Sequence, residues 1–190
     1  MIITPYYTEG NKHSKTIIDP YTKLLDSRII LLFNEINDDL AASVIAQLLL
    51  LEAANNTEPI SIYINSPGGA VTAGLAILDV MKSIKSPIKT ICVGACCSMA
   101  AVILAGGTKG ERYALPHSEI MIHQPLGGTH GQATDIIIHA ERIKVFKSTL
   151  SKMLSDFSGQ SLEKVMTDTE RDNFMSAQAA LEYGLIDKII

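Results

Sequence analysis

The sequence lacks an apolar run long enough to cross a bilayer, since runs such as Met99 to Ala105 fall far short of the roughly 20 residues required. Its first residues, MIITPYYTEGNKHSK, lack the basic start and hydrophobic core of a signal peptide. The 16 basic and 20 acidic residues are spread along the chain, with neither a basic stripe nor a polybasic anchor. These absences predict a cytoplasmic protein whose partners include no nucleic acid and no membrane.

Cysteine is also scarce, and the three cysteines, Cys92, Cys96 and Cys97, all lie in one short segment. This clustering favours buried thiols in a reducing compartment over a framework of disulfides. The chain has no second cluster of cysteine and histidine at ligand spacing. We therefore expect no metal site.

The length and composition are typical of one domain, because 190 residues with 47% hydrophobic content can bury a substantial core. Residues 1–20 differ from the rest. They contain Pro5, Gly10 and Pro20 among polar residues without periodicity, which is typical of an arm or loop. The sequence thus predicts an N-terminal arm over residues 1–20 and a single domain over residues 21–190.

Short strand patterns alternate with helical patterns along this domain, which predicts α/β units with largely parallel strands and right-handed crossovers. The longest helical pattern is expected to project or to pack against a partner. Strands are expected at Arg28 to Phe33, Ile60 to Ile64, Ile88 to Val93 and Glu119 to His123. Helices are expected from about Asp38, from Val71 to the stop at Ser86-Pro87, over Met99 to Ala105, over Gln132 to about Phe157 and over Ser176 to Tyr183.

Ser98 lies where a strand-like run, with a turn expected at Gly94, becomes a helix-like run. A serine at this position is commonly an N-cap, whose hydroxyl accepts a hydrogen bond from a free amide of the first turn. The same geometry suits a nucleophile, because free amides and the positive end of the helix dipole stabilise negative charge beside the hydroxyl. Both interpretations are open from this stretch alone.

A serine nucleophile needs a base and a group that orients the base. Of five histidines, only His123 ends a strand beside a Pro-Gly-Gly turn, although it is equally suited to a core-edge imidazole bonded to backbone. Asp172 lies in a partly apolar loop between helical patterns, where an ordinary turn or cap aspartate is the alternative. Spacing alone does not decide between these interpretations.

Five ordered blocks of the sequence resemble the ClpP family, the proteolytic subunits of the ATP-dependent Clp proteases. The similarity covers roughly residues 20 to 190, and its blocks are SPGGAVTAG, GACCSMAAVILAGGTKGERYALP, MIHQPLGG, GQATDI and TERDNFMSA with EYGLID behind it. The resemblance implies that Ser98 is the nucleophile, His123 the general base and acid, and Asp172 the orienting carboxylate. It also implies a crotonase-like fold of repeated β-β-α units with a protruding long helix.

The resemblance further implies a homo-oligomer of two stacked heptameric rings, a tetradecamer, in which Glu170 and Arg171 pair across the ring-to-ring interface. Its axial arm would be residues 1–20. Unfolded protein substrates would reach the enclosed chamber through an AAA+ unfoldase such as ClpX, ClpA or ClpC. ATP would be used by that partner, and no cofactor is expected in this subunit.

The tetrahedral intermediate of such a reaction needs donors for its oxyanion, and the amides of Gly69 and Met99 are the natural pair. By resemblance, the substrate lies as a strand along two glycine-rich segments. These are Gly69, Ala70 and Val71 on one side, and Pro125, Leu126 and Gly127 on the other. Backbone pairing of this kind makes cleavage weakly dependent on side chains.

Three other functions remain alternatives. A crotonase-type acyl-CoA enzyme would explain the two amides but not the serine, histidine and aspartate together. An α/β-hydrolase lacks support, because Ser98 has no flanking glycines of the G-x-S-x-G kind. A catalytically weak structural subunit of a mixed barrel is the third.

The chain departs from its family where the unfoldase is expected to dock. Tyr63 matches an aromatic position of that cleft, but Ser61 and Ser83 stand where aromatic residues are expected. Asp19-Pro20 is a further departure, in the arm. These departures predict a second, paralogous ClpP subunit that docks an unfoldase poorly alone, unless other apolar residues such as Leu48, Leu49 or Ile84 rebuild the cleft.

Overall fold

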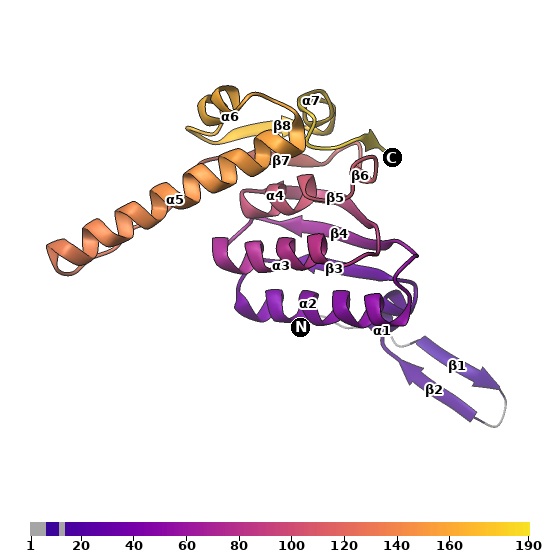
Figure 1. Cartoon of the computed structure of the whole chain (residues 1–190). Coiled ribbons are helices and arrows are strands. Elements are labelled where there is room, and N and C mark those ends of the chain that lie inside the picture. Colours follow the sequence, from indigo (N-terminus) through magenta and orange to yellow (C-terminus); the bar gives the residue numbers. More distant parts are fainter. Residues whose placement is uncertain (1–6, 12–13) are drawn as a thin grey trace.

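The computed structural model describes residues 7–11 and 14–190, and its centre is a largely parallel sheet (Figure 1). The predicted α/β class is confirmed. Its hydrogen-bonded strand order is β3 (Ile29–Phe33), β4 (Ile60–Ser66), β5 (Ile88–Cys97), β6 (Arg112–Ala114) and β9 (Lys188–Ile189), all parallel, with β7 (Glu119–Ile122) parallel to the end of β5 and β8 (Asn173–Ser176) antiparallel to β7.

The predicted helices form close to their expected bounds. Asn37 begins α2 as its N-cap, accepting a hydrogen bond from the Leu40 amide at 2.9 Å. Gly184 ends α7 in the left-handed conformation. The helices are α2 (Asp38–Ala54), α3 (Val71–Ser83), α4 (Met99–Ala105), α5 (Ala133–Ser158) and α7 (Ala177–Tyr183).

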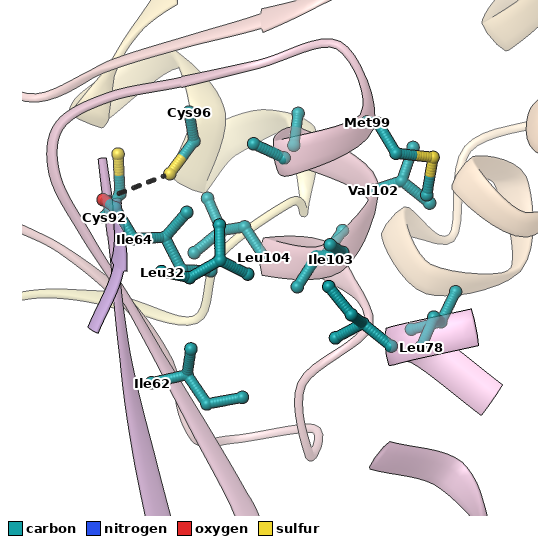
Figure 2. Packing of buried hydrophobic residues seen from close by; sticks show 14 of the residues in the cluster. Leu32, Ile62, Ile64, Leu78, Cys92, Cys96, Met99, Val102, Ile103 and Leu104 are labelled. Atoms are coloured by element: carbon teal, nitrogen blue, oxygen red, sulfur yellow. Dashed lines mark hydrogen bonds between the residues drawn. The ribbon is translucent and has the colours of Figure 1, made fainter. Parts of the chain in front are cut away.

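The core lies between the sheet and helices α2, α3 and α4, and Figure 2 shows side chains from β3, β4 and α4 meeting there. Alternate residues of β4 point into it, so Ile60, Ile62 and Ile64 are fully buried while Ser61 and Tyr63 face the other side. Every residue of α4 is buried. A helix enclosed on all sides holds its first residue, next to Ser98, in a fixed position.

Strand β5 is longer than predicted, because Gly94 does not end it. Gly94 has a φ of +83° and lies inside a bulge, where Cys92 pairs with Ile64 but Cys96 pairs with Ser66. Between these two pairs, three residues of β5 lie opposite a single residue of β4, and such a bulge bends the strand. Beyond the bulge, Cys97 pairs with Met121 of β7. The bulge thus delivers the end of β5, and Ser98 after it, to the end of β7.

The sequence did not predict several short elements, which lack enough residues to show a period. In the arm, β1 and β2 form an antiparallel hairpin that extends away from the sheet (Figure 1), while residues 1–6 and 12–13 lie outside the described residues. Asp19-Pro20 is an ordinary helix start, with Asp19 as N-cap and Pro20 in the first turn. The missed elements are β1 (Tyr7–Asn11), β2 (Ser14–Ile18), α1 (Pro20–Asp26), β6, α6 (Leu162–Asp168), β8 and β9.

Helix α5 packs on the body only at its C-terminal end, where Leu150 and Leu154 are buried. Its N-terminal half protrudes (Figure 1), and Ile137 and Ile138 there are 62% and 59% exposed. This protrusion matches the prediction from the long helical pattern. Within the described part of the chain, no helix combines the length and apolarity needed to cross a membrane.

Candidate active site

Ser98 joins β5 to α4 in a conformation that few serines adopt, with φ of 57° and ψ of −122°. The N-cap interpretation is wrong, because the hydroxyl makes no capping hydrogen bond. It lies instead 2.8 Å from Nε2 of His123. Positive φ at a residue with a Cβ costs about 1–3 kcal/mol and persists only where the surroundings impose it. Here the amide of Ser98 is held by the Met121 carbonyl at 2.8 Å.

His123 follows the last residue of β7 and lies between Ser98 and Asp172. Its side chain is 11% exposed, and its Nδ1 is 2.9 Å from Oδ1 of Asp172. An ionised carboxylate only accepts hydrogen bonds, so Nδ1 donates to Asp172. Nε2 is then the acceptor for the Ser98 hydroxyl. The imidazole is therefore held in the tautomer that can take a proton from the serine.

Asp172 immediately precedes strand β8, and this strand was absent from the sequence prediction. In the antiparallel pairing of β8 with β7, Asn173 lies opposite Ile122, so the next pair along the register is Asp172 and His123. Beyond it, the Gln124 amide donates to the Thr169 carbonyl at 2.6 Å. The loop before β8 is thus fixed to the segment after β7. The side chain of Asp172 is 58% exposed in the single subunit.

Two residues that line a cleft together with Ser98 have backbone amides without a protein acceptor among the described residues. Met99 is the first residue of α4, whose amide has no partner within the helix. Gly69 forms a parallel bridge with Ile36, in which the bonds run from Ile36 to Gly68 and from Ala70 to Ile36. The amide of Gly69 itself therefore points away from Ile36. Neither predicted oxyanion donor is occupied by another backbone group among the described residues.

These groups line a cleft of about 330 Å³. Its walls are mostly apolar, and α5 contributes to them through Leu150 and Leu154. The full lining is Glu35, Pro67, Gly68, Gly69, Val71, Ser98, Met99, Val102, Ile122, His123, Pro125, Leu126, Leu150 and Leu154.

The predicted substrate-binding segments border this cleft only in part. Gly69, Val71, Pro125 and Leu126 line it, whereas the amide of Ala70 is occupied by the Ile36 carbonyl at 2.8 Å. Gly127 lies in a neighbouring hollow with His123 and Asp172. Leu126 is 81% exposed.

Glu170 and Arg171 lie beside Asp172 on the surface. The carboxylate of Glu170 accepts a hydrogen bond from Lys147 at 2.8 Å, and this bond and the charge of Lys147 lower its pKa. The side chain of Arg171 has no hydrogen-bond or ion-pair partner among the described residues. Within one subunit, Glu170 therefore pairs with Lys147 and not with Arg171. The predicted pairing across rings stays a prediction.

Two further features were not predicted from the sequence. Glu35 lines the cleft, and its position just after β3, at a carboxyl end of a parallel strand, was a usable signal.

Arg112 is 3% exposed and forms a two-point ion pair with Asp187, at 2.6 and 2.8 Å. Arg112 also donates to the carbonyls of Ala105 and Phe157, at the ends of α4 and α5. No sequence signal marked this link between the two helices that border the site.

A serine hydroxyl, an imidazole and a carboxylate in one hydrogen-bonded row, beside two free amides, form the constellation that serine hydrolases use on many unrelated folds. The particular family follows from comparison of the chain with family models. The model of the Clp protease family matches residues 11–190, and the chain therefore belongs to the Clp protease family. Membership supports a peptidase role and agrees with the predicted crotonase-like fold.

Proposed function

We propose that this protein is a serine endopeptidase subunit that hydrolyses peptide bonds of unfolded proteins through an acyl-enzyme. The observation that carries the proposal is the row from Ser98 Oγ to His123 Nε2 at 2.8 Å and from His123 Nδ1 to Asp172 Oδ1 at 2.9 Å. Membership of the Clp protease family supports it. A crotonase-type acyl-CoA enzyme would use the two amides but would leave this row without a role.

In the proposed reaction, His123 takes the proton of the Ser98 hydroxyl while the oxygen attacks the substrate carbonyl carbon. The amides of Gly69 and Met99 bind the oxyanion of the tetrahedral intermediate. The intermediate collapses as His123 gives its proton to the leaving amine, which frees the new N-terminus. Water, deprotonated by His123, then attacks the ester, and Ser98 regains its proton. Throughout, Asp172 holds the imidazole and stabilises its charged form.

The substrate would lie as an extended strand over the cleft, between the segment at Gly69 and Val71 and the segment at Pro125 and Leu126. The proposed assembly is a cytoplasmic barrel of two stacked rings, to which an AAA+ unfoldase delivers unfolded chains, and family membership supports the barrel and its ATPase partner. The unfoldase would use the ATP, and the subunit itself would need no cofactor.

Replacement of Ser98 tests the proposal. The parent protein should react with a serine-directed phosphonate and turn over a short fluorogenic peptide, and Ser98→Ala should do neither. Ser151→Ala, at a buried serine of α5 outside the cleft, is the matched control and should retain both. Labelling of the Ser98→Ala protein would exclude Ser98 as the nucleophile. Absence of peptide turnover in the assembled parent would contradict the proposed peptidase activity.

A second candidate function is a subunit of a mixed barrel that docks an unfoldase poorly alone. The observation that favours it is that Ser61 shares the non-core face of β4 with Tyr63, where a neighbouring aromatic side chain is missing. The Ser83 hydroxyl donates a hydrogen bond to the Val80 carbonyl at 3.0 Å, and this side chain adds no apolar surface. Each missing aromatic group removes about 1.5–3 kcal/mol of the free energy that burial of its side chain would contribute to docking. Leu48 is fully buried in the core and cannot rebuild the cleft, whereas Leu49 is 50% exposed.

Degradation of a folded, tagged protein separates the two candidates. The assay combines this protein with its cognate unfoldase and ATP, with and without a paralogous proteolytic subunit. A mixed-barrel role predicts slow degradation by the homomer and a large increase when the second subunit is added. Efficient degradation by the homomer alone would contradict that role and leave the peptidase proposal intact.

A further inference from the structure

One side chain at the cleft differs in kind from its neighbours. Among the described residues that line the cleft, Glu35 and His123 alone carry ionisable side chains, and the imidazole of His123 is engaged by Ser98 and Asp172. The carboxylate of Glu35 makes no hydrogen bond or ion pair within the part of the chain that the structure describes. An exposed, unpaired negative charge therefore borders an otherwise apolar binding surface.

The backbone holds Glu35 firmly in this place. Strand β3 ends at Phe33, and Asn34 follows with a φ of 82°, a conformation that asparagine tolerates better than most residues. Asn34 donates to the Asn65 carbonyl at 3.2 Å. On the other side of Glu35, Ile36 is fully buried. Its amide donates a hydrogen bond to the Gly68 carbonyl, and its carbonyl accepts one from the Ala70 amide. The backbone on both sides of Glu35 is thus held by hydrogen bonds.

This arrangement suits a side chain with a long apolar stem and a positive end. The stem of a lysine or arginine packs on apolar walls while its charged head stays near water. In this cleft the walls come from residues such as Val71, Met99 and Leu150, and Glu35 is at the border. An aspartate or glutamate of the substrate would meet the same charge with repulsion.

We infer that Glu35 is a specificity-determining residue, which makes the cleft prefer a peptide that places a lysine or arginine beside the scissile bond and disfavour an acidic residue there. The inference rests on the proposed peptidase function and adds a substrate preference to it. The attraction acts between partly solvated charges, so the expected preference is moderate, about three- to tenfold in kcat/KM.

The test uses the assembled protein and internally quenched peptides that differ only at one residue, which is lysine, methionine or glutamate. One series varies the residue before the scissile bond and a second series varies the residue after it. For each enzyme, the measured quantities are the lysine-to-methionine and glutamate-to-methionine ratios of kcat/KM. The enzymes are the parent, Glu35→Gln, Glu35→Lys and the control Glu58→Gln, which removes the same charge from an exposed position outside the cleft.

In one of the two series, the parent should prefer lysine over glutamate, Glu35→Gln should reduce this preference by about three- to tenfold, and Glu35→Lys should invert it. The control should keep the ratios of the parent. The preference should also shrink between about 50 mM and 500 mM salt, because screening weakens exposed charge pairs. If the methionine peptides are cleaved and Glu35→Gln keeps the ratios of the parent in both series, the inference is wrong. Absence of cleavage of every peptide by the parent would instead refute the proposed function.

Discussion

Replacement of Gly69 by alanine is the sharpest test of the oxyanion site, because the structure leaves no room for a single added carbon. A Cβ on Gly69 would lie 2.1 Å from the carbonyl oxygen of Ile36 and 2.8 Å from its nitrogen. Both are backbone atoms of a residue that is fully buried, so they cannot rotate away. The φ of Gly69, +149°, is also one that a residue with a Cβ rarely adopts. The turn must therefore move, and the amide of Gly69 moves with it.

The expected loss follows from the role proposed for that amide. Displacing one donor of an oxyanion site typically removes about 2.7–4 kcal/mol of transition-state stabilisation, or a factor of 10² to 10³ in kcat. The atoms nearest to the added carbon belong to Ile36 and not to Ser98, His123 or Asp172. Gly69→Ala should therefore lower kcat for a fluorogenic peptide by about this factor.

Gly128→Ala is the matched control, because a Cβ at Gly128 would meet nothing within 4 Å. It should retain the kcat of the parent. Urea unfolding and sedimentation of both variants show whether each protein folds and assembles. A folded, assembled Gly69→Ala protein with a kcat within about threefold of the parent would refute the proposed role of the Gly69 amide.

Three further predictions concern the surroundings of the site. Asp187→Asn leaves the buried charge of Arg112 without its partner and should lower the free energy of unfolding by about 3 kcal/mol in urea titrations. Burial alone would raise the pKa of Asp187, but the hydrogen bonds and charge of Arg112 outweigh it and lower the pKa. The pair therefore stabilises the fold at neutral pH, and the difference between parent and variant should shrink as the pH falls below about 4. Arg171→Ala should give smaller particles by sedimentation and slower peptide turnover if ring docking positions the neighbouring aspartate, and wild-type values of both would contradict that coupling. Replacing His123 with alanine should abolish peptide turnover, because no side chain then accepts the serine proton, and turnover at the rate of the parent would exclude His123 as the base.

Local patterns in the sequence determined the α/β architecture. The isoleucines of β4 alternate with polar residues, and this period of two leaves one face for the core. The apolar positions of α2 recur with the helical period, and Asn37 and Gly184 mark helix ends by their own chemistry. Ser98 and His123 were also identifiable, because each stands at the end of a strand. These signals are local, and a few neighbouring residues suffice to carry them.

The tertiary structure alone decided how the site comes together. The bulge at Gly94 carries β5 past its predicted end, and the register of β8 on β7 brings Asp172 opposite His123 across a separation of 49 residues. Neither the bulge nor the register of β8 produces a repeating pattern in the sequence. A bulge is a single local departure from alternation, and β8 is too short to show an alternation of its own. The pairing of Glu170 with Lys147 and the place of Glu35 at the cleft have the same origin. Each depends on which strands and helices become neighbours, and packing of the whole hydrophobic core determines which ones do.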